Sequence, residues 1–236
     1  MRDPRRYNVA VPVVLGIAGT TAGGALAAAW LPAGISYPIT AAAIAAAALV
    51  AFVVVGGQQH PHPRFGPANA VTTARVGFVA LVAATARIEA GARGLWLAVV
   101  LSSAAAILDG LDGWLARRTG LSSDFGARFD METDALLILA LSVLVWQNDK
   151  AGAWVLGSGL MRYAFVAAGW VLPWMAHPLR STLRGKTVAV VQIAGLIVAL
   201  APIIPLPYSA LVAAVTLGAL IWSFSVDIIW LARQES

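Results

Sequence analysis

The stretch ILDGLDGWLARRTGLSSDFGARFDMETDA, residues 107–135, holds five of the eight aspartates in a chain of 236 residues. Carboxylates in or beside a bilayer are costly unless they pair with cations or bind metal ions. Asp109 and Asp112 are three residues apart near the end of one apolar segment, and Asp130 and Asp134 are four apart at the start of the next. Residues at these spacings share one helix face. We therefore predict that two adjacent helices present their carboxylates to a shared cleft.

The chemistry of this window favours a divalent-metal site. Its four paired carboxylates, with no cysteine or nearby histidine, form a hard oxygen site that suits Mg²⁺, Mn²⁺ or Ca²⁺. Two such ions together neutralise a diphosphate and its leaving group, which suits phosphoryl transfer. Gly113 and Ala116 are small where a ligand has to approach the helix, and Gly126 precedes Asp130. Arg117 can contact a phosphate through its guanidinium fork. The window is therefore interpreted as the centre of an enzyme.

The composition of the whole chain indicates an integral membrane protein. It is 60% hydrophobic and 11% charged, whereas soluble domains carry about 25% charged residues. No cysteine is present, so disulfides and thiolate zinc sites are excluded. The net charge of +5 reports topology and contact with anionic lipid rather than nucleic-acid binding. We expect no nucleic-acid partner.

The apolar segments predict an all-α, polytopic transmembrane bundle. Each is near the ~20 residues that a bilayer core requires. With the N-terminus in the cytoplasm, most basic loop residues fall on the cytoplasmic side, and only Arg87, Arg93 and Lys150 on the far side. Both termini are therefore predicted to be cytoplasmic. The eight expected spans are 9–32, 36–56, 68–87, 94–116, 130–147, 151–174, 185–204 and 208–231.

A break in the apolar pattern predicts the domain organisation. The segment at 57–67 is rich in Gly, Pro and His and cannot continue a helix. We interpret it as a linker between a two-helix transmembrane unit, 1–56, and a six-helix core, 68–236.

The window also carries a family signature. It matches D-x2-D-G-x2-A-R-x8-G-x3-D-x3-D without departure, and the chain thereby resembles the CDP-alcohol phosphotransferase family. The matching positions are Asp109, Asp112, Gly113, Ala116, Arg117, Gly126, Asp130 and Asp134. Asn69, Thr72 and Arg75, spaced by three, and a later Gly185-Lys186-x5-Gln192 pattern are similar to the family as well. Ala189 replaces a Thr that some members carry.

This resemblance implies transfer of a substituted phosphate from a CDP-linked donor to an alcohol, with release of CMP. It implies two divalent cations, Mg²⁺ or Mn²⁺, and a homodimer. With the predicted topology, the enzyme is expected in the inner (plasma) membrane with its active site facing the cytoplasm. By resemblance, Asp109, Asp112 and Asp130 are metal ligands, and Asp134 is a ligand and the general base. The CDP-binding residues implied are Asp112, Gly113, Ala116, Arg117, Gly126, Asn69 and Thr72.

Basic residues beyond the window indicate where an anionic acceptor binds. Arg162 lies within a predicted span, where an arginine is functional by default. Arg180, Arg184 and Lys186 crowd the next cytoplasmic loop. Together they can form a pocket for a phosphorylated alcohol. The alternative is that they only fix orientation, and for Arg180 the two interpretations weigh equally. Asp227, in the last span, is expected to be interfacial or paired rather than catalytic.

The leading hypothesis is a phospholipid-synthesis enzyme that transfers the phosphatidyl group of CDP-diacylglycerol to glycerol 3-phosphate, as a phosphatidylglycerophosphate synthase does. Inositol phosphate, another polar alcohol or phosphatidylglycerol are alternative acceptors. A divalent cation transporter is the alternative from another class, since intramembrane carboxylates also mark ion paths. Transporters usually place such groups near the midplane, whereas these lie at predicted cytoplasmic ends. A non-catalytic scaffold is a third alternative, which the intact signature disfavours.

Overall fold

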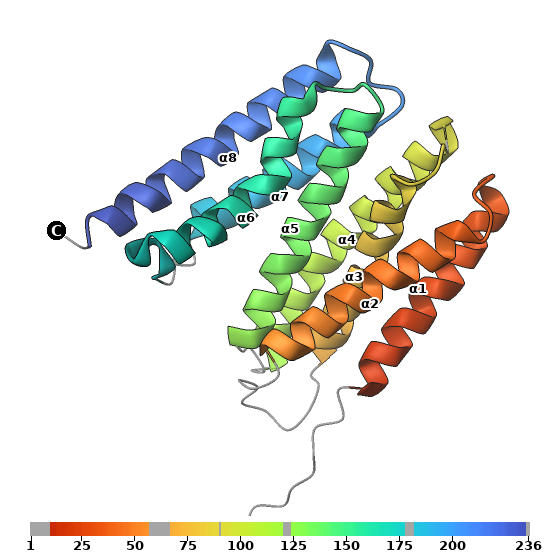
Figure 1. The fold of residues 1–236 in the computed structure, drawn as a ribbon, viewed down its shortest axis with the longest axis horizontal. Coiled ribbons are helices and arrows are strands. Elements are labelled where there is room, and N and C mark those ends of the chain that lie inside the picture. The colour runs from red at the N-terminus through yellow and green to blue at the C-terminus, as the bar shows by residue number, and fades with distance from the viewer. Residues whose placement is uncertain (1–9, 57–66, 90, 120–123, 178–181, 235–236) are drawn as a thin grey trace, which may run out of the picture. The chain divides into compact units, whose positions relative to one another are not determined.

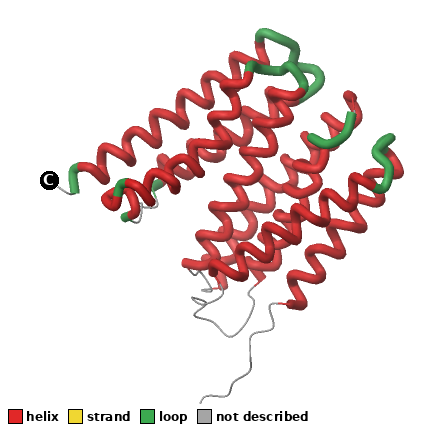
Figure 2. The backbone as a smooth tube through the Cα atoms, viewed as in Figure 1, coloured by secondary structure: helices red, strands yellow, loops and turns green. Residues whose placement is uncertain are grey.

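The computed structural model describes residues 10–56, 67–89, 91–119, 124–177 and 182–234, and their regular secondary structure is entirely helical (Figure 2). The all-α prediction is therefore confirmed for this part of the chain. The helices, in chain order, are α1 (Ala10–Trp30), α2 (Ser36–Gly56), α3 (Pro67–Thr85), α4 (Gly91–Thr119), α5 (Asp124–Gln147), α6 (Leu156–Val171), α7 (Leu183–Leu200) and α8 (Tyr208–Ala232) (Figure 1). Two short 3₁₀ turns, η1 (Ala153–Val155) and η2 (Pro173–Ala176), flank α6.

Four helical segments of the described chain are long and apolar enough to cross a bilayer, and the chain is an integral membrane protein. They are Val11–Trp30, Gly91–Gly110, Leu183–Leu200 and Tyr208–Ala232. Ser36–Phe52 and Val71–Thr85 are apolar but shorter. The count of eight spans and the cytoplasmic termini stay predictions. Of the predicted linker, residues 57–66 lie outside the described residues.

The segment predicted as one span at 151–174 has a different local structure. It contains η1, the 16-residue helix α6 and then η2. Pro173 is the reason for the second break, because proline has no N–H to donate and its ring clashes with the preceding turn of a helix. Leu172, just before it, is extended, with φ −115° and ψ 97°. A helix therefore does lie within the predicted range, but it is shorter than the predicted span.

The chain divides into two compact units, Met1–Asp134 and Ala135–Ser236, with the division inside α5. In the first unit, α3 packs against α1, α2 and α4. Small residues permit the close approach, as transmembrane helices require: a Cβ on Gly77 of α3 would lie 2.7 Å from Oγ1 of Thr20 on α1. The buried Tyr37 hydroxyl donates a 2.8 Å hydrogen bond to the carbonyl oxygen of Leu81. Thus α3, which carries Arg75, is held firmly by its neighbours.

In the second unit, α7 and α8 pack along each other. A Cβ on Gly195 of α7 would lie 2.4 Å from Cγ2 of Thr216 on α8, so glycine sets their separation. The ammonium of Lys150, just after α5, donates to the carbonyl oxygens of Ala201 and Ile204 at 3.0 and 2.8 Å. These carbonyls follow the C-terminal end of α7, where a cation is favourable. The turn between α7 and α8 is thereby fixed to the end of α5.

Candidate active site

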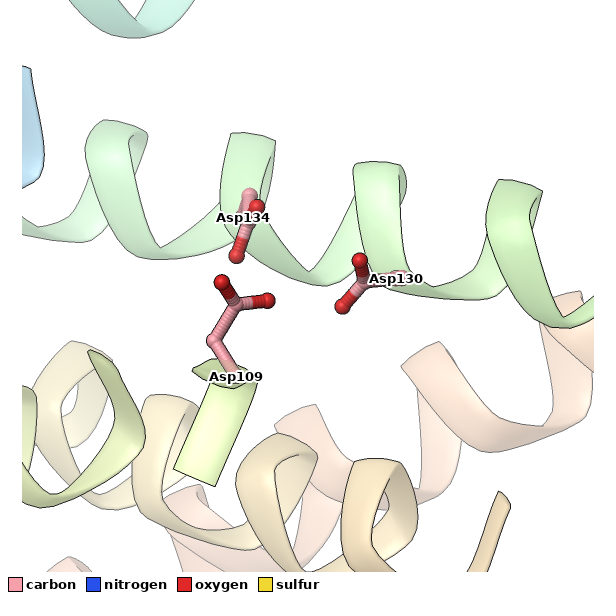
Figure 3. A group of neighbouring side chains, drawn as sticks. All are labelled: Asp109, Asp130 and Asp134. Atoms are coloured by element: carbon pink, nitrogen blue, oxygen red, sulfur yellow. The ribbon is translucent and has the colours of Figure 1, made fainter. Parts of the chain in front are cut away.

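The centre of the site is a group of three aspartates from α4 and α5. Asp130 and Asp134 are one helical turn apart on α5 and lie on the same face, as their spacing predicts. Asp109 extends from α4 toward them (Figure 3). One carboxylate oxygen of each residue lies within 4.8 Å of those of the other two. Two helices separated in sequence by a connecting segment therefore do present carboxylates to one place.

Arg75, on α3, binds all three carboxylates. Its Nη1 donates to Oδ1 of Asp130 and lies 2.9 Å from Oδ1 of Asp109. Its Nη2 donates to Oδ1 of Asp134 at 2.5 Å. The arginine side chain is only 1% exposed, whereas the aspartates are 27%, 39% and 21% exposed in chain order. The guanidinium therefore lies on the buried side of the cluster, and the carboxylates face the accessible side.

The charges of this cluster suit a divalent cation. Two like charges 4 Å apart near a protein surface repel by about 4 kcal/mol, so three clustered carboxylates need positive charge nearby. Arg75 supplies one positive charge against three negative ones when all are ionised. Oxygen-only ligands are the set that Mg²⁺ and Mn²⁺ prefer. The residues present therefore fit a hard divalent ion.

Comparison with known proteins agrees with this chemistry. The family model for CDP-alcohol phosphatidyltransferases matches residues 65–226, which is more than half of the chain. This chain belongs to the CDP-alcohol phosphatidyltransferase family. It is a transferase of phospholipid head-group chemistry, and the family uses CDP-alcohol substrates, an alcohol acceptor and divalent metal ions. No solved structure matches the chain significantly.

Several residues assigned to the CDP site of this transferase lie where their side chains are not described. Asp112, Gly113, Ala116 and Arg117 are on the last turns of α4, following Asp109. Asn69 is in the first turn of α3. Their predicted roles stay predictions.

Two other residues of the predicted CDP site can be placed. Gly126 is partly buried in the first turn of α5. Thr72 is buried on α3, three residues before Arg75 and therefore on the same helix face. That Gly126 and Thr72 bind CDP stays a prediction.

Three of the four predicted acceptor residues of the transferase, Arg162, Arg184 and Lys186, belong to the second compact unit. Arg162 is partly buried on α6, Lys186 is exposed on α7, and Arg180 lies outside the described residues. Arg184, on α7, donates to Oδ1 of Asp227 on α8. The expectation that Asp227 is paired is confirmed. The grouping of these basic residues with the aspartates stays a prediction.

The structure adds detail around Arg184. Its guanidinium carbon lies 5.8 Å from the ring centroid of Trp222, within cation–π distance. Thr182 caps α7, with its Oγ1 accepting a 3.1 Å hydrogen bond from the N–H of Gly185. The cap fixes the first turn of α7, and the pair with Asp227 and the ring of Trp222 fix the side chain. Arg184 is therefore held in a defined orientation.

Arg75 is the site residue that sequence reasoning missed. The family resemblance pointed to its helix, but only Asn69 and Thr72 were assigned a role there. A signal was present, since a charged residue inside an apolar helix needs a partner. Arg75 also follows Thr72 by three residues, which places it on the same face.

Proposed function

We propose that this transferase moves the phosphatidyl group of CDP-diacylglycerol to glycerol 3-phosphate and releases CMP. The observation that carries the proposal is the convergence of Asp109, Asp130 and Asp134 in a chain whose family match spans 65–226. A cluster of hard oxygen ligands can hold the divalent ions that a negatively charged diphosphate donor requires. The basic residues Arg162 and Arg184 support an acceptor that carries a phosphate.

In the proposed reaction, Asp134 acts as the general base and takes the proton of the acceptor hydroxyl. The acceptor oxygen then forms a bond to the phosphatidyl phosphorus, and the bond from that phosphorus to the oxygen of CMP breaks. CMP leaves with the electron pair. Asp109, Asp112 and Asp130 would hold the metal ions, with Asp134 as a further ligand. Two bound divalent ions would neutralise the diphosphate and the leaving CMP.

The remaining expectations complete the proposal. Residues 1–56 form an accessory two-helix unit, 57–67 a linker and 68–236 the catalytic core. The family match begins at residue 65, which leaves α1 and α2 outside it. The chain works as a homodimer in the inner membrane, with the site on the cytoplasmic side. Light scattering of the detergent-solubilised protein tests the dimer.

One assay tests the donor, the acceptor and the metal together. Purified protein is given Mg²⁺ or Mn²⁺, cytidine-labelled CDP-diacylglycerol and one acceptor at a time: glycerol 3-phosphate, an inositol phosphate, serine or phosphatidylglycerol. We expect labelled CMP to be released with glycerol 3-phosphate. Excess EDTA or the change Asp130→Asn should abolish release, while the variant still elutes as a folded protein in detergent.

Each part of the proposal can fail separately in this assay. Release that depends on a different alcohol reassigns the acceptor alone. Release that persists in EDTA contradicts the metal mechanism. No release with any acceptor, in the presence of metal, contradicts CDP-diacylglycerol as the donor.

A further inference from the structure

We infer that Arg75 is an internal counter-cation, which competes with divalent metal ions for the three aspartates and so sets the metal affinity of the site. The inference rests on the proposed metal site. It concerns a residue to which the family match assigns no role here. It makes Arg75 a positioning residue rather than a catalytic one.

The first argument is the position of the guanidinium. Asp109 comes from α4, Asp130 and Asp134 come from α5, and Arg75 comes from α3. One buried side chain therefore links three helices through both of its Nη atoms. Removing one member of a buried ion cluster leaves the remaining charge uncompensated, which is costly. The guanidinium thus stabilises the carboxylates in their clustered arrangement.

The second argument is competition for the same groups. A divalent ion bound to these carboxylates lies within a few ångströms of the guanidinium, because each of the three carboxylates already contacts it. Like charges at such distances repel strongly where water is scarce. Metal binding therefore requires the guanidinium to withdraw, or proceeds at reduced affinity. In both cases Arg75 weakens metal binding.

The third argument is the direction of access. The aspartates are partly exposed, whereas Arg75 is buried behind them. An ion can therefore reach the carboxylates without passing the arginine. α3 is held by its contacts with α1, α2 and α4, so the guanidinium can shift only by rotation of its own side chain.

The test measures metal binding directly, without donor or acceptor. Full-length protein in detergent is stripped with EDTA and titrated with Mn²⁺, and free Mn²⁺ is followed by electron paramagnetic resonance. Wild type is compared with Arg75→Gln, which removes the charge, and Arg75→Lys, which keeps a charge but lacks the fork that contacts two helices. Arg93→Gln, at an exposed position at the start of α4, removes the same charge as a matched control. Asp109→Asn should lose Mn²⁺ binding and so identifies the site that is titrated.

We expect Arg75→Gln to bind Mn²⁺ on the order of tenfold more tightly than wild type, a difference of about 1.4 kcal/mol. Arg75→Lys should fall between the two, and Arg93→Gln should match wild type. In EDTA, the thermal midpoint of Arg75→Gln should be lower than that of wild type, and Mn²⁺ should raise it by more. A merely structural arginine would lower the midpoint without tightening Mn²⁺ binding.

The inference is overturned if either Arg75 variant binds Mn²⁺ as wild type does or more weakly, if Arg93→Gln tightens binding equally, or if wild type binds no Mn²⁺. If Arg75→Gln does not fold, the affinity of Arg75→Lys relative to wild type decides the question. A chain that shows the expected order of affinities but releases no CMP supports the role of Arg75 and contradicts the proposed transfer. Normal transfer with weakened Mn²⁺ binding in Arg75→Gln contradicts only the role of Arg75.

Discussion

At the scale of single residues, two arginines in apolar helices are held by aspartates from other helices. Arg75 contacts three of them, and Arg184 contacts Asp227. The two arrangements differ in a way that matters for chemistry. The guanidinium of Arg75 is buried, whereas Arg184 and Asp227 are each about a quarter exposed, at 24% and 22%. Arg184 can therefore still meet a ligand while Asp227 keeps it oriented.

The change Arg184→Ala should weaken binding of the acceptor and leave binding of the donor unchanged. A charge-assisted hydrogen bond is worth about 1.5–3 kcal/mol, so the KM for glycerol 3-phosphate should rise roughly 10- to 150-fold. The KM for CDP-diacylglycerol should stay near wild type. Both are measured by CMP release, with the exposed Arg87→Ala as control.

A reversed ion pair separates binding from helix packing in this experiment. The double change Arg184→Asp with Asp227→Arg keeps one positive and one negative charge between α7 and α8. It should restore much of the thermal midpoint but not the acceptor KM. Recovery of both quantities would show that Arg184 only ties the two helices together.

Single residues also show which contacts could be predicted from the sequence and which could not. The shared face of Asp130 and Asp134 follows from a spacing of four, so it could be predicted. The partners of Arg75 could not, because helical periodicity gives a face but not the helix that this face meets. Asp130 and Asp134 lie 55 and 59 residues later in the chain. For the same reason, the sequence could not show that the partner of Asp227 is Arg184, 43 residues before it.

At the scale of elements, glycines decide which helices approach closely. On α6, Gly159 faces α5, and a Cβ there would lie 2.5 Å from the backbone Cα of Leu139. Gly157, two residues earlier on the same helix, has no atom within 4 Å of such a Cβ. Backbone cannot move aside as a flexible side chain can. The contact at Gly159 therefore fixes the distance between α5 and α6.

The two glycines form a matched pair for a stability measurement. Gly159→Ala should destabilise the protein by about 1–3 kcal/mol, as overpacking typically does. Gly157→Ala should be neutral or stabilise it by up to about 1 kcal/mol, because alanine favours a helix over glycine. Thermal unfolding in detergent distinguishes them. Equal midpoints for the two variants would contradict the close packing of α5 and α6.

The element scale also contains the clearest missed signal. The end of α6 could have been predicted more closely, since Pro173 stands inside the segment that was expected to be one span. Hydropathy alone predicts that the span extends past Pro173, because apolar residues continue on both sides of the proline. In contrast, the start of α5 at Asp124 could not be placed from hydropathy, since its first two turns carry the charged residues Asp124, Arg128 and Asp130. Local packing around charged residues decides such boundaries.

At the scale of the whole molecule, the orientation in the membrane is open to a direct test. The chain has no cysteine, so an introduced cysteine is the only thiol of the protein that a maleimide can label. Ile35→Cys, between α1 and α2, and Ile203→Cys, between α7 and α8, lie at exposed positions that the predicted topology puts on the far side. Gln234→Cys lies after α8. An impermeant maleimide added to intact cells should label the first two and spare Gln234→Cys until the membrane is opened. The opposite pattern would invert the predicted topology.

The cluster around Arg75 has a consequence for how the protein is made. Asp109 on α4 is synthesised 34 residues after Arg75, and the partners on α5 at least 55 residues after it. When α3 leaves the ribosome, its arginine has none of these acidic partners, and an arginine at the centre of a span costs about 2.5–3.5 kcal/mol to insert through the translocon. The nascent α3 should therefore remain beside the translocon until α4 and α5 emerge to compensate the charge. We expect these three helices to enter the membrane together rather than one at a time.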